Sequence, residues 1–237
     1  MQWIRFFLLA LVLIPGTAWA QSLNIDFGDV AGPSPLGPGF GAASGQTGEW
    51  NTITAVGSTS NLVGLGAAAT GVSLTLGPAI VNPDGASGLL TGDLNLLMAD
   101  FFFESSQADL WNVTLTGVDS GVYDVYVYAP ANISSLQGTG TFTINGIAMS
   151  DIPGTGIQNF IQGVNYEILS DLTVTDGTIT FASTEASTRF LGLAGVQLVQ
   201  VPEPVPVMTP WGLMVLASAL ALAGSLTHRY RREILHN

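Results

Sequence analysis

Short runs in which apolar and polar residues alternate recur through residues 21–200, and they limit the folds open to this chain more than any other feature. The clearest run is 122–128, where every second side chain from Tyr123 onward would share one face of a strand. The opposite face of that run would carry Asp124, Tyr126 and Tyr128. No convincing helical repeat of apolar residues occurs in this region. Eight or more such runs with turn residues between them predict an all-β, antiparallel β-sandwich.

Turn residues between neighbouring runs predict three hairpins. Asn145-Gly146 would join 141–144 to 147–149, because both residues tolerate the positive φ of a two-residue hairpin turn. Asp176-Gly177 would join 172–175 to 178–181, and 117–121 would join 112–116 to 122–128. Further strands are expected at 23–27, 72–76, 96–103 and 193–199.

The first twenty residues have the layout of a secretory signal. Arg5 precedes the apolar stretch 6–14, a Pro-Gly pair follows, and Ala18-Trp19-Ala20 provides a small-x-small cleavage site. We expect residues 1–20 to form a signal helix that is removed, leaving Gln21 as the mature N-terminus.

The C-terminal end has three elements in a fixed order. A Pro-rich segment, 201–210, is followed by the apolar run 211–227 and by a basic tail, 228–237. The apolar run is near the lower length limit for a transmembrane helix, and arginines after it predict a cytoplasmic end. The residues that define the pattern are Val201, Pro202, Glu203, Pro204, Pro206, Thr209, Trp211, Gly212, Arg229, Arg231 and Arg232.

This arrangement resembles the C-terminal sorting signals of the PEP-CTERM and IPTL-CTERM families. Residues 201–204 are similar to the PEP motif, and 206–213 to the Pro-Thr-Leu-Ser-x-Trp-Gly pattern of the second family. Val207 stands where that family has Thr, and Thr209 where it has Ser. The resemblance implies an exosortase-type membrane protease as a partner and leaves the cleavage position open. The alternative is an ordinary C-terminal anchor with a proline-rich spacer.

Composition excludes several classes of function for residues 21–200. Fifteen carboxylates face a single base, Arg189, so the net charge is −14. Nucleic acid is excluded as a partner because its binding requires cationic groups. This region has no cysteine and no histidine, which rules out Ser-His-Asp catalysis, a thiol nucleophile and a histidine-ligated zinc ion. A carboxylate pair of the glycosidase kind is the main catalytic route left.

A second resemblance rests on motifs spread over 24–200. They are 24–28, Gly48-Glu49-Trp50-Asn51, 89–93, 123–128, 142–146 and 193–199. In this order they resemble the malectin-like and galactose-binding-like jelly-roll domains of bacterial surface proteins. The resemblance implies a jelly-roll-like sandwich that often binds carbohydrate and sometimes holds a structural calcium ion.

Three groups of residues are candidates for binding. Glu49, Trp50 and Asn51 end the Gly-rich segment 28–50, where the Trp would either clamp a ligand or plug the sandwich edge. Asp124, Tyr126 and Tyr128 would form a glycan platform, although plain sheet packing explains such tyrosines more often. Asp26 and Asp29, with Glu49, would supply oxygen ligands for calcium, or they are solvated acids.

These patterns lead to one preferred function and two alternatives. We expect an exported precursor, anchored in the inner membrane and then processed, that ends in the cell envelope, on the surface or in the extracellular matrix. Its sandwich would be non-catalytic, would bind extracellular glycan and would need no cofactor. The alternatives are a carboxylate-dependent glycan-acting enzyme and a purely structural surface protein.

Overall fold

The computed structural model describes residues 21–27, 36–37, 39–43, 46–54, 57–59, 61–77, 80–82, 97–98, 101–103, 112–128, 142–149, 152, 159–183, 192–203, 214 and 218. The chain divides into two compact units, 1–202 and 203–237. The predicted signal helix and Asp29 lie outside the described residues, as does the sorting pattern from Pro204 onward. Among the residues described, no helix has the length and apolar character needed to cross a membrane.

The first unit is mostly β. Its strands are β1 (Leu23–Asp26), β2 (Trp50–Thr52), β3 (Gly57–Thr59), β4 (Ser73–Leu76), β5 (Ile80–Asn82), β6 (Phe101–Phe103), β7 (Asn112–Thr116), β8 (Gly121–Tyr128), β9 (Phe142–Ile144), β10 (Ile147–Met149), β11 (Tyr166–Val174), β12 (Thr178–Ser183), β13 (Gly192–Leu193) and β14 (Gly195–Val201). Helical conformation in the described part of this unit is limited to Leu97 and Met98.

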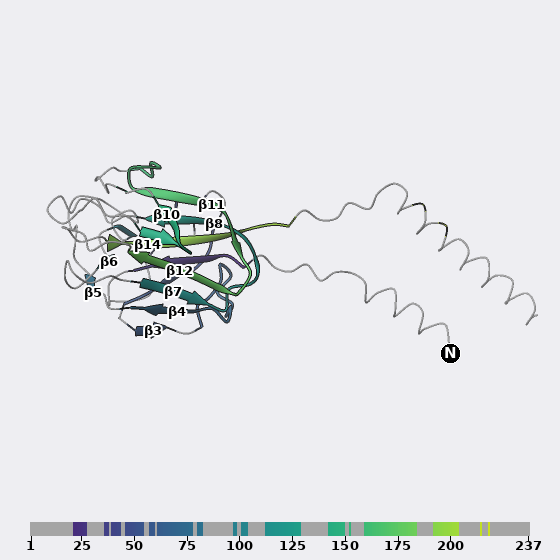
Figure 1. The fold of residues 1–237 in the computed structure, drawn as a ribbon, viewed down its shortest axis with the longest axis horizontal. Helices are drawn as coiled ribbons and strands as arrows, with labels where there is room; N and C mark the ends of the chain where they lie inside the picture. The colour runs from purple at the N-terminus through teal and green to yellow at the C-terminus, as the bar shows by residue number, and fades with distance from the viewer. Residues whose placement is uncertain are drawn as a thin grey trace, which may run out of the picture. The chain divides into compact units, whose positions relative to one another are not determined.

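Two larger sheets hold most of the strands (Figure 1). The first sheet has the order β11-β8-β14-β1-β2, and the second has the order β10-β9-β12-β7-β4-β3. A third, small sheet has the order β13-β6-β5. All pairs are antiparallel except β1 with β2, which is parallel. This arrangement is consistent with the predicted β-sandwich.

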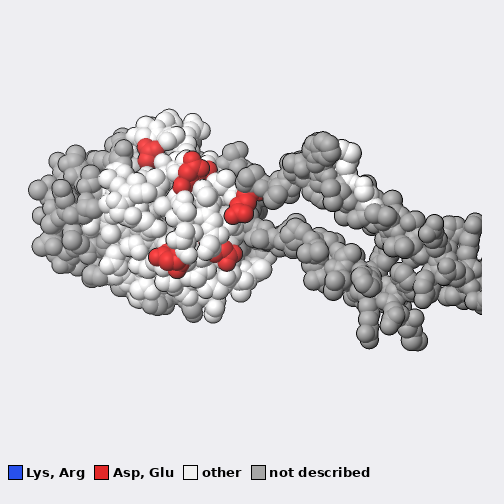
Figure 2. Space-filling view, turned by 45° about the vertical axis from the view of Figure 1, so that its right-hand side comes forward, with Lys and Arg blue, Asp and Glu red and all other residues white. Residues whose placement is uncertain are grey.

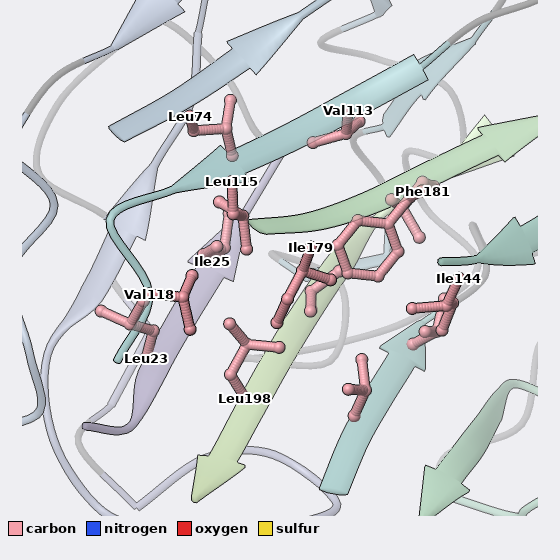
Figure 3. Close-up of a cluster of buried hydrophobic side chains, with 14 of the residues drawn as sticks. Leu23, Ile25, Leu74, Val113, Leu115, Val118, Ile144, Ile179, Phe181 and Leu198 are labelled. Atoms are coloured by element: carbon pink, nitrogen blue, oxygen red, sulfur yellow. The ribbon is translucent and has the colours of Figure 1, made fainter. Parts of the chain in front are cut away.

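The main core lies between the facing sides of the two larger sheets. The alternation read from the sequence is visible in β12, where every second residue is buried. Figure 3 shows Leu23 and Leu198 of the first sheet pointing into the same space as Leu115 and Ile179 of the second. Each such side chain contributes about 1.5–3 kcal/mol when it is removed from water. The alternating apolar residues therefore hold the two sheets together.

One of the three predicted hairpins is confirmed. β9 and β10 pair antiparallel across Asn145-Gly146, with Ile144 opposite Ile147. Asn145 has φ 48° and Gly146 has φ 78°. The Asn145 side chain also accepts a hydrogen bond from Thr180 N at 2.7 Å, which ties the turn to β12.

The other two predicted hairpins are wrong, because each turn carries the chain from one sheet to the other. β7 pairs with β4 and β12, whereas β8 pairs with β11 and β14. β11 and β12 likewise belong to different sheets. Apolar residues on two strands that face each other across a core alternate just as they would in a hairpin. The pattern therefore could not separate the two cases.

The turn after β7 shows what directs the crossing. Val118 enters the core with 4% of its surface exposed, and Tyr123 OH donates to Asp119 O at 2.9 Å. Burial, and secondly the charge of Asp119, raise the pKa of Tyr123 to about 12. Val118 N also donates to Gly177 O at 3.1 Å, so the two crossing turns support each other.

Several strand boundaries also differ from the prediction, and β11 begins at Tyr166 rather than at 172. In the range 96–103, Leu97 and Met98 are helical and only 101–103 forms a strand. The final strand begins and ends two residues later than expected, at Gly195–Val201, after the short β13.

Gly117 is the position in the crossing turn most sensitive to substitution. Its φ is +78°, and a Cβ there would lie 2.7 Å from Gly71 O, a backbone atom. Gly146 has the same φ but open space around it. We expect Gly146→Ala to cost about 1–2 kcal/mol of stability from the backbone alone. Gly117→Ala should cost clearly more in urea denaturation, and equal losses for the two variants would contradict this packing of the turn.

Candidate functional site: the outer face of the first sheet

Strand pairing brings two rows of side chains together on the side of the first sheet that faces away from the main core. One row consists of Trp50, Asn24, Gln197 and Tyr126, from β2, β1, β14 and β8 in turn. The next row consists of Thr52, Asp26, Gly195 and Tyr128. The candidate site is built on these two rows, and parts of segment 36–50 pack against them.

A buried polar network fixes part of that segment on the sheet. Gln46 donates from Nε2 to Asn24 Oδ1 at 2.8 Å, and to Leu23 O and Leu198 O at 3.2 and 3.1 Å. Gln197 Nε2 donates to the same Asn24 oxygen at 2.9 Å. Asn24, Gln46 and Gln197 are all buried. Because hydrogen-bonded polar groups tolerate burial, the network holds Gln46 in place rather than destabilising the fold.

Tyr128 extends this network. Its hydroxyl donates to Gln197 Oε1 and accepts from Ala42 N at 2.6 Å. Ala43 N donates to the same Gln197 oxygen at 3.2 Å. Tyr128 has no exposed surface, and burial raises its pKa well above the usual value. It remains a neutral hydrogen-bonding group at physiological pH.

Aromatic rings form a second apolar cluster beside the network. Trp50 and Tyr128 lie at its buried end, with ring centroids 6.5 Å apart. Phe160 lies 5.3 Å from Tyr128 and 5.2 Å from Phe40. Tyr166 completes the cluster at 6.1 Å from Phe160, in an edge-to-face contact. Phe40, Phe160 and Tyr166 are half-buried, so the cluster runs from a packed interior to solvent.

The structure separates the predicted group Glu49, Trp50 and Asn51. Trp50 is 7% exposed and packs in the second cluster. This placement agrees with the alternative in which the Trp plugs the sandwich edge rather than clamping a ligand. Asn51 instead forms two hydrogen bonds with the backbone of Val63. Its Nδ2 donates to Val63 O and its Oδ1 accepts from Val63 N, both at 2.8 Å. Glu49 is exposed. The three side chains do not converge on one point.

The three residues of the predicted glycan platform, Asp124, Tyr126 and Tyr128, differ in exposure. Tyr128 is buried, so it presents no ring face to a ligand. Tyr126 is half-buried and stacks on Tyr166, with centroids 6.2 Å apart and rings inclined by 20°. Burial, then the charges of Asp124 and Tyr166, raise its pKa. Asp124 is half-buried and accepts from Asp171 N at 3.1 Å.

Two of the three predicted calcium ligands, Asp26 and Glu49, are described, whereas Asp29 lies outside the described residues. Asp26 is 3% exposed in the second row, whereas Glu49 lies outside it and is exposed. Among the residues described, no three His, Cys, Asp or Glu side chains are grouped so that they could hold a metal ion. Three buried polar atoms on these two rows have no hydrogen-bond partner in the described part of the chain, namely Asn24 Nδ2, Trp50 Nε1 and Thr52 Oγ1.

Sequence reasoning missed the residues that complete this face. Gln46 and Gln197 hold the network, and Phe40, Phe160 and Tyr166 extend the aromatic cluster. One signal was present: Gln197 is the only polar side chain in the run 193–199. A lone polar residue in an apolar strand needs a buried partner. The aromatic residues lie far apart in sequence and carried no such signal.

Comparisons with known proteins give little further information. No family model matches this chain, and no curated protein matches it. A solved structure, the crystal structure of the Bacillus subtilis protein YXIM, is similar with a TM-score of 0.42 and 13% sequence identity. That match covers 80% of this chain and 43% of the other, so this chain spans less than half the length of that protein.

Proposed function

We propose that this chain is an exported cell-envelope protein with a C-terminal membrane anchor, processed by an exosortase-type protease. Its first unit is a non-catalytic β-sandwich of the jelly-roll type that binds neutral carbohydrate. The observation that carries the proposal is the order of the C-terminal elements, in which the Pro-rich motif, the apolar run and the arginines follow one another directly.

The end of the last strand supports this division of the chain. β14 ends at Val201, which pairs with Val122, and Pro202 follows at once. Proline has no N–H for a sheet hydrogen bond and therefore ends the ladder. The sorting motif thus begins where the folded sheet ends, with no intervening spacer.

The two ends of the described part of the first unit lie close together, which also supports attachment of the precursor to one membrane. Gln21 N donates to the side chain of Gln200, and Gln200 N donates to Ser22 Oγ at 3.2 Å. The predicted signal segment and the predicted sorting segment therefore join the domain at neighbouring points. This arrangement allows one membrane to hold a precursor at both ends.

The half-exposed aromatic rings support a carbohydrate ligand. Tyr126 and Tyr166 are half-buried rings, and the carboxylate of Asp124 lies on the same face as Tyr126. An aromatic ring offers a face to the C–H groups of a sugar, and a carboxylate accepts hydrogen bonds from its hydroxyls. Figure 2 shows acidic side chains spread over one face of the protein, with no basic side chain among the described residues there. Such a surface disfavours anionic glycans, so the proposed ligand is neutral.

Tyr126→Ala tests this binding site. We expect the retention of this variant on a neutral polysaccharide to fall about fivefold to tenfold, because one stacking contact with a sugar contributes about 1 kcal/mol. The melting temperature should fall by only about 2–4 °C, because the ring is half-buried and loses one stacking contact with Tyr166. Ile147→Ala, on an exposed residue of the second sheet, is the control and should bind normally.

The same experiment separates the alternatives. A panel of polysaccharides is tested for retention of the protein and for release of reducing ends. Retention without release supports binding, whereas release supports a glycan-acting enzyme that uses carboxylates. If nothing in the panel is retained, carbohydrate binding is rejected and a structural role remains.

A further inference from the structure

We propose that the predicted mature N-terminus is a built part of the fold, and that its contacts keep Gln21 from cyclising to pyroglutamate. The inference rests on the proposed export only in taking Gln21 as the first residue. It concerns one group of residues, Gln21, Asp119 and Gln200, which we call the N-terminal site.

The N-terminal site holds both reactive ends of Gln21. The backbone nitrogen donates to Gln200 Oε1, and the side-chain oxygen accepts from Asp119 N at 2.7 Å. In the full chain, in which residue 20 still precedes it, Gln21 is 8% exposed. The two partners come from different parts of the chain, since Gln200 lies on β14 and Asp119 lies in the turn between the sheets.

The partners are themselves fixed. Gln200 N donates to Ser22 Oγ at 3.2 Å, and Gln200 Nε2 lies 2.6 Å from an ideal Cβ position on Gly121, so a side chain at 121 would displace it. Asp119 O accepts the hydroxyl of Tyr123, which has no exposed surface. The N-terminal site is therefore preformed by the packing of the first sheet and of the crossing turn.

Cleavage before Gln21 converts its amide nitrogen into an α-amino group. This group still has N–H donors, so it keeps the bond to Gln200 Oε1 and gains strength when it is charged. The new positive charge lies in a region that has fifteen carboxylates and one other base. Cleavage thus leaves the contacts in place and adds a favourable charge.

An N-terminal glutamine loses ammonia when its free amine attacks its own side chain. The uncharged amine forms a bond to Cδ and gives up a proton, the bond from Cδ to Nε2 breaks, and the amide nitrogen takes up a proton and leaves as ammonia. For this reaction the side chain must bend back to the amine. In the N-terminal site the side-chain oxygen is held by Asp119 and the nitrogen by Gln200, so cyclisation requires local opening.

The test uses the full chain in detergent, with a factor Xa site in place of residues 17–20. The protease then releases Gln21 as the first residue whatever the cell's own processing does. One sample is incubated folded and the same protein is incubated in urea. Mass spectrometry of the N-terminal peptide measures the loss of ammonia. We expect cyclisation in the folded sample to be on the order of tenfold slower, because two hydrogen bonds must open first.

Two variants assign the protection to the N-terminal site. Gln200→Met removes one of the two hydrogen bonds and should raise the folded rate by about threefold, which is half of the protection on a logarithmic scale. Gln162→Met makes the same change at an exposed glutamine and should leave the slow rate unchanged. Equal rates for folded and unfolded wild-type protein would overturn the proposal, and this comparison does not depend on either variant folding. Retention of Met1 in the cell would contradict the proposed signal-peptide cleavage without affecting this result.

Discussion

Trp50→Ala is expected to lower the free energy of unfolding by about 3–5 kcal/mol, the usual cost of removing a buried Trp. Only 7% of the Trp50 surface is exposed, and its ring packs against Tyr128 in the second cluster. The loss should appear in urea denaturation as a lower midpoint with little change in slope. A loss of this size would assign Trp50 to packing rather than to ligand contact.

Two controls make this result specific. Trp50→Phe keeps much of the apolar volume and should cost less than half as much as Trp50→Ala. Glu49→Ala changes an exposed neighbour and should have almost no effect on stability. If Trp50→Ala left stability unchanged but abolished retention on polysaccharide, the packing role would be wrong and the clamp alternative would hold.

Deletion of residues 204–237 is expected to move the protein from the membrane to the soluble exported fraction. The deletion removes the apolar run 211–227 and its arginines, which the proposal makes the only lasting anchor. It begins after Glu203 so that β14, which ends at Val201, stays intact. Cell fractionation with immunoblotting measures the shift, which should be nearly complete.

The matched control for this deletion removes only residues 233–237. It shortens the same tail but leaves Arg232 and the apolar run in place. That variant should fractionate with the wild-type protein. Persistence of the longer deletion in the membrane would contradict the anchor assignment.

The sequence predicted the class of fold because alternation has a direct physical cause. A strand that covers a core on one side buries every second residue, as β12 does. The Asn145-Gly146 hairpin was predictable for the same reason, since its two φ values need those residue types. Strand partners were less predictable. β8 joins the first sheet because the chain crosses between the sheets in the turn 117–120, where Val118 enters a core that is built from residues far away in sequence.

The candidate site was predictable only in part. Tyr126 and Asp124 were placed on one strand face correctly, but nothing local indicated that Tyr128, two residues on, would be buried. Its burial follows from segment 36–50, whose Ala42 bonds its hydroxyl across 86 residues of sequence. Periodicity reports which side of a strand a residue occupies. It does not report what covers that side.

The central claim is that this chain is exported and processed, and the ends of the native protein test it most directly. Mass spectrometry of the protein isolated from each cell fraction identifies its first and last residues. Our account predicts envelope or extracellular material that begins at Gln21. Folded protein in the cytosol that still begins at Met1 and ends at Asn237 would contradict it.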